Sequence, residues 1–213
     1  IKKKEPNFAN SNKQNISAWW SQIETWRKKN SLGFKNSKDV IKPQFAVQRL
    51  YELTKAQDVF ITTEVGQHQM WAAQHYKFKE PRSWISSGGS GAMGFEVPGA
   101  MGAQVGRPDK TVWSIAGDGG FQMTMCELAT LAENKIPVKF AILNNNYLGM
   151  VRQWQEMFYN KDYVASTYSA NPDFVKLAKA FGIFGTRVTK QEEITAAIHE
   201  AMDFDGPAIV DFI

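Results

Sequence analysis

Asp118 and Asn145 are the residues whose types and positions point most directly to chemistry. Asp118 belongs to the sequence GDGG (117–120), which follows the apolar run 112–116, and Asn145 follows a second apolar run, 138–143. Apolar residues at helical spacing lie between the runs, which predicts a strand–helix–strand unit with a right-handed crossover between parallel strands. Both residues therefore fall at the carboxyl ends of parallel strands, where open α/β sheets bind ligands.

The residue types at this edge suit a metal ion and a phosphate. The glycines of GDGG let the backbone turn tightly and approach a phosphate, and the helix that follows offers free N–H groups at its start. Asp118 and Asn145 supply oxygens, which Mg²⁺ readily shares with substrate phosphates. The pattern predicts a magnesium ion that clamps a diphosphate. The alternative is a plain turn at GDGG and a plain loop at 144–146, but the placement of an Asp and an Asn after successive strands favours the ligand site.

Two further loops are expected at the same crevice. The run 58–63 predicts the first strand, and the loop 64–68 lies beyond its carboxyl end. A short strand at 83–86 leads into 87–94, where small residues permit close backbone approach to a flat ligand. Met93 is the one bulky side chain among these small residues. It either contacts the ligand or simply fills a gap in the packing, as methionine often does.

These segments together resemble a known enzyme family. GDG, a helix, an apolar strand and Asn-Asn are similar to the motif of enzymes that use thiamine diphosphate. The words GQHQMWAAQHY (66–76), SSGGSGAMGF (86–95), ELATLAENKIPVK (127–139) and NYLGMVRQWQEMFY (146–159) resemble the catalytic subunit of acetohydroxyacid synthase, also called acetolactate synthase. The resemblance runs from about Pro43 to the last residue.

The resemblance implies a role for individual residues. Gln67 and His68 would hydrogen-bond the diphosphate, Met93 would be a wedge that bends the cofactor, and Tyr147 would give its backbone carbonyl to the metal. The implied metal ligands are Asp118, Asn145 and Tyr147, and the implied cofactor-binding residues are Gln67, His68, Gly91, Ala92, Met93, Gly117, Asp118, Gly119, Gly120, Asn145, Tyr147, Leu148, Gly149 and Met150.

The aromatic run 151–159 has two interpretations. Its helical stripe, with Trp154 and Phe158, is typical of a buried core. The resemblance instead places Val151 and Trp154 at the substrate channel.

The resemblance also implies an activity. The enzyme would decarboxylate pyruvate and join the remaining two-carbon unit to pyruvate or 2-ketobutyrate, in branched-chain amino-acid biosynthesis. It would use thiamine diphosphate, Mg²⁺ and FAD, with FAD bound mostly by domains absent here, and would act as a homodimer or larger assembly with a small regulatory subunit. The alternatives are another thiamine-dependent enzyme, of the glyoxylate carboligase or pyruvate oxidase type, or a non-catalytic cofactor-binding fragment. In the family the activating glutamate comes from an N-terminal domain, so we expect no catalytic residue in this chain and no turnover by the chain alone.

Composition and charge narrow the possible partners and the cellular location of the protein. The chain has 213 residues, a net charge of +4 and a sequence pI near 9.0. Because the basic residues are mostly scattered, we expect no nucleic-acid partner. Cys126 is the single cysteine, and we expect it on a core helix. It cannot form an intramolecular disulfide, which favours a reducing compartment. No apolar run is long enough to span a membrane and no signal peptide is visible, so we expect cytoplasm or plastid stroma, not secretion and not a membrane.

The whole pattern predicts an α/β fold. We expect a doubly wound, mostly parallel sheet of about six strands with helices on both faces. Residues 1–36 are expected to be a linker and helix from the end of a preceding domain, and 37–213 the thiamine-diphosphate and magnesium domain, without its C-terminal tail. Within 1–36, residues 1–12 are polar, and the three tryptophans of the helix at 16–29 either pack on a neighbouring domain or form a ligand platform. The remaining strands are expected at 185–188 and 208–213, and the remaining helices at 43–53, 95–105, 174–181 and 191–202.

Overall fold

The computed structural model describes residues 13–29 and 32–213, which fall into two compact units. The first unit runs to Lys35 and the second comprises Asn36–Ile213. In the first, helix α2 (Lys13–Arg27) carries Trp19, Trp20 and Trp26, each about half exposed. Packing of these tryptophans on another domain stays a prediction, and the polar segment 1–12 lies outside the described residues.

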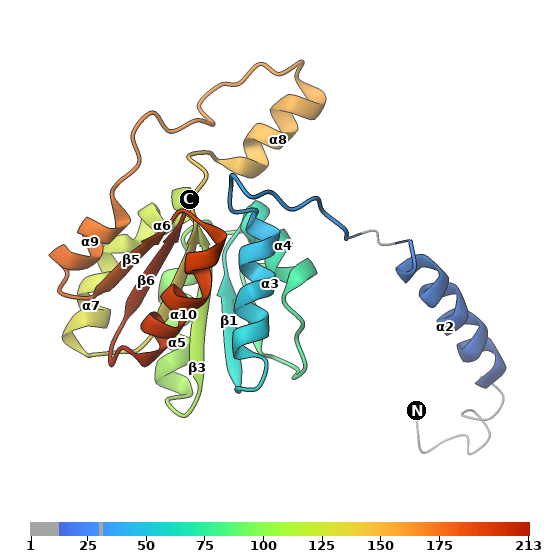
Figure 1. The fold of residues 1–213 in the computed structure, drawn as a ribbon, viewed down its shortest axis with the longest axis horizontal. Coiled ribbons are helices and arrows are strands. Elements are labelled where there is room, and N and C mark those ends of the chain that lie inside the picture. Colours follow the sequence, from blue (N-terminus) through green and yellow to red (C-terminus); the bar gives the residue numbers. More distant parts are fainter. Residues whose placement is uncertain (1–12, 30–31) are drawn as a thin grey trace. The chain divides into compact units, whose positions relative to one another are not determined.

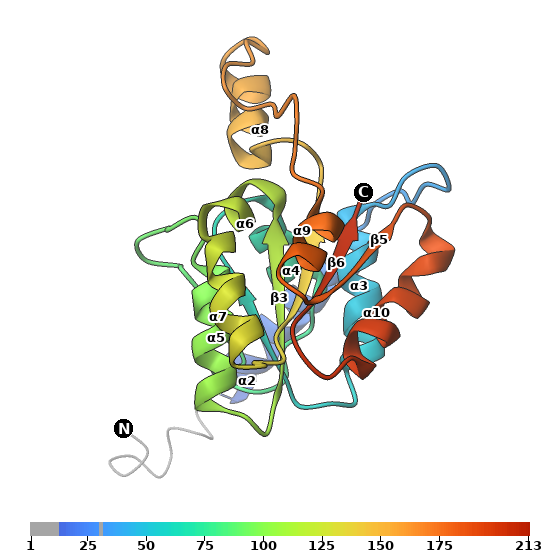
Figure 2. The same ribbon diagram turned by 90° about the vertical axis from the view of Figure 1, so that its left-hand side faces the viewer.

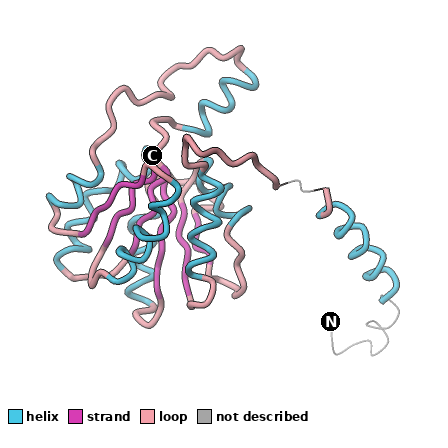
Figure 3. The backbone as a smooth tube through the Cα atoms, in the orientation of Figure 1, coloured by secondary structure: helices cyan, strands magenta, loops and turns pink. Residues whose placement is uncertain are grey.

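A six-stranded parallel sheet forms the centre of the second unit, drawn in magenta in Figure 3. Every neighbouring pair of strands is parallel, and the order across the sheet is β2-β1-β3-β4-β6-β5. The predicted fold class is confirmed. The strands are β1 (Val59–Thr63), β2 (Trp84–Ser86), β3 (Thr111–Gly117), β4 (Lys139–Leu143), β5 (Phe184–Val188) and β6 (Ala208–Phe212).

Helices cover both faces of this sheet (Figures 1 and 2). The core on one face joins α3, α4 and α10 to the strands, and the core on the other joins α5, α6, α7 and α9. The helices are α3 (Pro43–Thr54), α4 (Gln67–His75), α5 (Glu96–Gly106), α6 (Asp118–Thr124), α7 (Leu128–Glu133), α8 (Gly149–Phe158), α9 (Phe174–Ala180) and α10 (Ile194–Asp203), with 3-10 turns at η1 (Met125–Glu127) and η2 (Gln191–Glu193).

Side-chain alternation explains why the sheet is buried on both sides. In β4, Phe140 and Ile142 belong to one core while Ala141 and Leu143 belong to the other. Neighbouring strands repeat this pattern, so the strands read as continuous apolar runs, as expected for a parallel sheet between two helix layers.

Two features of the strand order matter for the site. The chain leaves β1 toward β2 on one side, whereas β3 leads to β4 on the other, so the order reverses between β1 and β3. Such a reversal leaves a crevice at the carboxyl ends of the strands. In addition, β6 lies between β4 and β5 and every one of its residues is buried.

The helix predicted after GDGG differs from expectation. It begins at Asp118 itself, and a 3-10 turn at η1 breaks it into α6 and α7. Cys126 falls in this turn and is exposed, so its predicted place in the core was wrong.

The interpretation of 151–159 as core was also wrong. Helix α8 has no buried residue, and Trp154 and Phe158 are 57% and 66% exposed. Their rings are in edge-on contact at 6.5 Å between centroids, which confirms the aromatic stripe without its burial. Figure 1 shows α8, in light orange, standing apart from the two helix layers.

Candidate functional site

A pocket lies where the strand order reverses. Loops that follow β1, β3 and β4 form its wall, and Met93 is added from the loop that precedes α5. Apart from Gly91 and Ala92, every predicted cofactor-binding residue lines it: Gln67, His68, Met93, Gly117, Asp118, Gly119, Gly120, Asn145, Tyr147, Leu148, Gly149 and Met150.

The predicted channel residues lie at a second opening. Val151 lines both the first pocket and an open pocket of about 1130 Å³ beside α8, and Trp154 lines only the latter. Met150 is also common to the two, so the openings adjoin along the start of α8.

Asp118 and the loop after β4 are brought together by strand register. β3 and β4 are hydrogen-bonded neighbours in which Gly117 pairs with Leu143, so the residues that follow them emerge side by side. Oδ2 of Asp118 accepts a hydrogen bond of 2.9 Å from the backbone N–H of Asn146. The predicted proximity of the two strand ends is therefore confirmed.

Burial makes Asp118 an unusual carboxylate. It is 1% exposed, and the loss of water raises its pKa above the ordinary value, while hydrogen bonds from Asn171 and Asn146 oppose that rise. A divalent cation would stabilise the ionised form in such a place.

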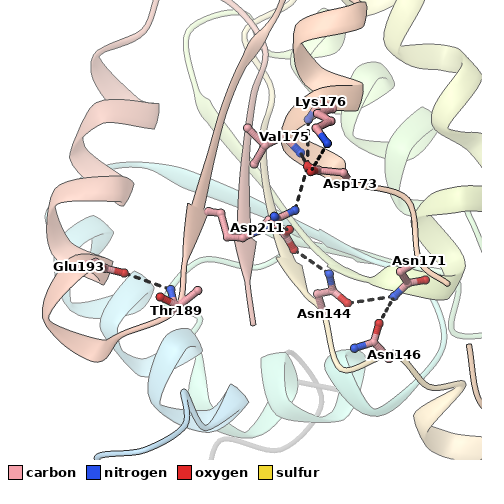
Figure 4. A network of polar contacts seen from close by, with 10 residues as sticks. Asn144, Asn146, Asn171, Asp173, Val175, Lys176, Thr189, Glu193 and Asp211 are labelled. Carbon is pink, nitrogen blue, oxygen red and sulfur yellow. Dashed lines mark hydrogen bonds and ion pairs between the residues drawn. The ribbon is translucent and has the colours of Figure 1, made fainter. Parts of the chain in front are cut away.

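Asn171 links Asp118 to a wider polar network, and Figure 4 shows the part of this network beyond Asp118. Its Nδ2 donates to Asp118 Oδ2 at 2.6 Å and lies 3.0 Å from the side-chain oxygens of Asn144 and Asn146. Asn144 in turn donates to the buried carboxylate of Asp211 at 3.0 Å.

The far end of this network fixes helix α9. Arg187 pairs with Asp211 and also with Asp173, and Asp173 caps α9 by accepting from the backbone N–H groups of Val175 and Lys176. The predicted helix at 174–181 is confirmed as α9. The side chains that orient Asp118 are thus held by two strands and a helix cap.

The loop after β4 has a tightly specified backbone. Asn146 has a φ of +62°, in the left-handed region that Asn tolerates better than most residues. Asn145 Oδ1 accepts from the backbone N–H of Tyr147 at 3.0 Å, and Tyr147 forms an isolated antiparallel bridge to Thr167.

Glycines are required at the pocket because side chains crowd them. A Cβ at Gly119 would lie 2.5 Å from the Tyr168 hydroxyl, and one at Gly149 would lie 2.2 Å from Oε1 of Gln67. The backbone at both positions is therefore free to approach a ligand, as a phosphate-binding loop must.

His68 is a buried neutral ring. It is 6% exposed, and burial lowers its pKa to about 3. Among the described residues its Nε2 has no hydrogen-bond partner, although Glu64 Oε1 lies 3.4 Å away. An unpaired buried nitrogen at the pocket wall fits the predicted contact with a diphosphate, which stays a prediction.

The residues present fit magnesium and a diphosphate. A buried carboxylate and an amide oxygen from adjacent strand ends are oxygen donors of the kind Mg²⁺ takes, and crowded glycines adjoin them. Asp118 and Asn145, with the backbone carbonyl of Tyr147, are the residues that would hold the ion, and those three assignments stay predictions.

Sequence reasoning missed three residues. Glu64 lines the pocket and is 1% exposed, Glu96 is fully buried at the start of α5, and Asn171 orients Asp118. Glu64 directly follows β1, so its position was a usable signal. Asn171 lies just before the predicted helix 174–181, and its residue type is ordinary there.

Comparison with known proteins gives consistent matches. A family model described as thiamine pyrophosphate enzyme, C-terminal TPP binding domain, matches residues 64–212. The chain is 46% identical over 209 residues to acetolactate synthase 1, chloroplastic, of Nicotiana tabacum, covering 94% of this chain and 31% of the relative.

Bacterial and fungal relatives match similarly. Identity is 44% over 188 residues to the acetolactate synthase isozyme 3 large subunit of Escherichia coli (strain K12), covering 88% of this chain and 33% of that one. It is 43% over 213 residues to the mitochondrial acetolactate synthase catalytic subunit of Aspergillus candidus, covering 98% and 30%. The chain spans about a third of the length of these curated relatives.

No helix among the described residues is long and apolar enough to cross a membrane. The family match covers most of the second unit and includes every residue that lines the pocket. The chain belongs to the thiamine pyrophosphate enzymes, in the family of their C-terminal TPP-binding domain.

Proposed function

We propose that this chain is the cofactor-binding domain of an acetolactate synthase catalytic subunit. The complete enzyme would decarboxylate pyruvate and condense the two-carbon unit with pyruvate or 2-ketobutyrate, a step of branched-chain amino-acid biosynthesis. The observation that carries the proposal is the convergence of the glycine loop, Asp118, Asn145 and Met93 on one pocket. The names of the relatives support it.

Individual residues would divide the work of binding. Asp118, Asn145 and the Tyr147 carbonyl would hold Mg²⁺, while Gln67 and His68 would contact the diphosphate. Bound thiamine diphosphate would supply a carbon acid whose conjugate base can add to a ketoacid carbonyl, and a ring that can take up the electron pair left by departing CO₂. The chain's own part is to orient and bend that group and to keep water away from it.

Apolar side chains support the exclusion of water. Met93, Leu148 and Met150 line the pocket, and Met93 is the bulky residue of its loop. We propose that Met93 is the wedge under the cofactor. Val151 and Trp154, at the adjoining opening, would then contact the second ketoacid as it enters.

Other parts of the proposal rest on the resemblance. FAD would be bound mostly outside this chain, and the catalytic subunit would form a homodimer or larger assembly. The Escherichia coli relative is called a large subunit, which supports a small regulatory partner. The tobacco relative is called chloroplastic, and we propose the cytoplasm or plastid stroma for this protein.

The test is acetolactate formation from pyruvate in the presence of thiamine diphosphate, Mg²⁺ and FAD. We expect activity from the complete catalytic subunit and none from residues 1–213 alone, because the activating glutamate would come from another domain. Loss of a positioned acid or base typically costs on the order of 10²–10⁴-fold in rate.

Two controls separate the alternatives. Glyoxylate as sole substrate, and oxygen consumption with pyruvate, test the carboligase and oxidase types. If the complete subunit binds thiamine diphosphate but turns over none of these substrates, the non-catalytic reading holds. Turnover by the isolated chain would instead reveal an acid within it, and Glu64 is the first residue to substitute.

A further inference from the structure

Glu64 is a buried acid at the junction of three pocket loops. It follows β1 and is 1% exposed. Its Oε2 accepts a hydrogen bond of 2.6 Å from the backbone N–H of Gly94, the residue after Met93. Its Oε1 has no hydrogen-bond partner among the described residues.

The Gly94 peptide is held from its other side as well. Its carbonyl oxygen accepts a hydrogen bond of 2.8 Å from Oγ1 of Thr124, at the end of α6. Gly94 has a φ of +79°, so the backbone turns sharply after Met93. Because both the N–H and the C=O of this residue are bound, the position of Met93 is fixed by contacts to β1 and α6.

Gly120 leaves the space that Glu64 occupies. A Cβ at Gly120 would lie 1.6 Å from Oε1 of Glu64 and 2.0 Å from its Cδ. Any side chain at 120 would therefore expel the carboxylate from its place at the Gly94 N–H. The glycine loop, Glu64 and the Met93 loop thus interlock through one carboxyl group.

The carboxyl group of Glu64 is buried, so it has lost the water that would stabilise its charge. The pKa of Glu64 is raised to about 7, mainly by burial and also by the nearby charge of Asp118, while hydrogen bonds from the backbone N–H groups of Gly94 and Val65 oppose the rise. The neighbouring His68 is neutral, since burial lowers its pKa to about 3, so it supplies no compensating charge. A buried acid without a cation is costly, and one that persists at a pocket marks a position with a specific task.

We propose that Glu64 is a positioning residue that locks the Met93 loop into the wall of the cofactor pocket, and that Gly120 is the glycine that makes this lock possible. The lock rests on the proposed function, since it serves the contact between Met93 and the bent thiamine diphosphate. The diphosphate would be held by other loops. Glu64 therefore acts on the organic part of the cofactor through Met93 and touches no phosphate.

The first measurement is hydrogen exchange at the Gly94 amide, followed by NMR in the ligand-free 213-residue chain. Removing the acceptor in Glu64→Ala should speed exchange by about tenfold or more, because a hydrogen bond to a carboxylate is lost. Glu64→Gln keeps a side-chain oxygen in place and should restore most of the protection. Glu80→Ala, which removes an exposed glutamate, is the matched control and should change nothing.

The second measurement compares two ligands by calorimetry in the presence of Mg²⁺. Glu64→Ala should weaken thiamine diphosphate by about tenfold but inorganic diphosphate by less than about twofold, since only the former meets Met93. A general folding defect would weaken both ligands in parallel. Glu64→Gln should return thiamine diphosphate affinity to near that of the wild type.

The third measurement is a double-substitution cycle. Gly120→Ala alone should speed Gly94 exchange as Glu64→Ala does, because it displaces the same carboxylate. In the Glu64→Ala background it should add little, since the colliding group is gone.

Three results would overturn the lock: unchanged Gly94 exchange in Glu64→Ala, parallel loss of both ligands, or full additivity in the cycle. A wild-type chain that binds neither ligand would overturn the proposed function alone. Exchange at Gly94 and the cycle would then decide the lock without any ligand.

Discussion

The pocket at the strand ends and helix α8 adjoin in the fold and share Met150 and Val151, yet they are built in opposite ways. The pocket rests on the ends of β1, β3 and β4, where Asp118 and Glu64 are each 1% exposed and added Cβ atoms would collide with side chains. Helix α8 has a strong apolar stripe and no buried residue. Apolar periodicity therefore predicts a helix but not its burial. The close packing of the pocket comes instead from the loops at the strand ends.

The largest contrast should appear in stability. Phe174 on α9 is fully buried, whereas Phe158 on α8 is 66% exposed. Phe174→Ala should lower the free energy of unfolding by about 3–5 kcal/mol, through lost burial and a cavity. Phe158→Ala should change it by less than about 0.5 kcal/mol. Equilibrium urea unfolding of the chain measures both, and similar losses would break the comparison.

Cofactor binding should depend most on Asp118. Loss of residues that merely orient metal ligands costs about 10–100-fold, so loss of the carboxylate itself in Asp118→Ala should cost at least about 100-fold in Mg²⁺-dependent affinity for thiamine diphosphate. Asn145→Ala should cost less, and Asn171→Ala about tenfold as an orienting residue. Calorimetric titration with and without Mg²⁺ measures this.

Asp109→Ala is the control for that series, because Asp109 is exposed and paired with Arg107. It should bind like the wild type. Unchanged affinity in Asp118→Ala would place the metal elsewhere.

The pH dependence of stability should be intermediate in size. Folded Glu64 keeps its proton up to about pH 7, whereas an unfolded glutamate releases it near its ordinary value of 4.5. At Glu64 the folded state therefore binds more protons between these values, and the contribution of this group to stability should fall as pH rises through this range, by on the order of 1–3 kcal/mol. The pKa values of Glu96 and Asp118 are also raised by burial and act in the same direction. His68 and His75 act in the opposite direction below about pH 6.5, because burial lowers their pKa values and the unfolded imidazole binds a proton that the folded one does not.

Urea unfolding from pH 5 to pH 8 without Mg²⁺ is the measurement. Glu64→Gln removes the fall that Glu64 causes, so its stability should rise relative to that of the wild type as pH increases, whereas Glu80→Gln should follow the wild type. A slope in Glu64→Gln equal to that of the wild type would show that Glu64 ionises normally in the fold.

The smallest effects should separate two helix glycines. A Cβ at Gly149 would lie 2.2 Å from Oε1 of Gln67, whereas one at Gly102 would meet nothing within 4 Å. Overpacking costs about 1–3 kcal/mol, so Gly149→Ala should weaken thiamine diphosphate by roughly tenfold. Gly102→Ala should leave binding unchanged and stabilise the fold by about 0.5–1 kcal/mol. Equal binding by the two variants would mean that the loop yields to the added methyl group.

The sheet and most of the pocket could be predicted because they depend on local signals. Apolar runs that end at glycine or asparagine give the strands, and parallel order follows from the crossover, so Asp118 and the loop after β4 were placed together correctly. The interruption of the helix at η1 has no such signal, and Cys126 was therefore misplaced in the core.

Residues that act across long separations were the ones missed. Asn171 reaches Asp118 from 53 residues away, and Glu64 reaches Gly94 from 30. Their residue types are ordinary for a helix start and a loop. Only the packing of the finished fold shows that one orients a carboxylate and the other fills the space beside Gly120.

The interior position of β6 has a consequence for the order of events during folding. β5 precedes β6 in the sequence, but its strand hydrogen bonds in the sheet are to β6 alone. While the chain is being synthesised, β5 has no neighbouring strand to pair with. One edge of β4 also stays unpaired until residues 208–212, which form β6, have been made. Parallel pairing between distant segments is slow, and an open edge invites pairing with other chains. A ribosome that stalls shortly before β6 would therefore release a polypeptide that lacks an inner strand of its sheet, and such a polypeptide should aggregate.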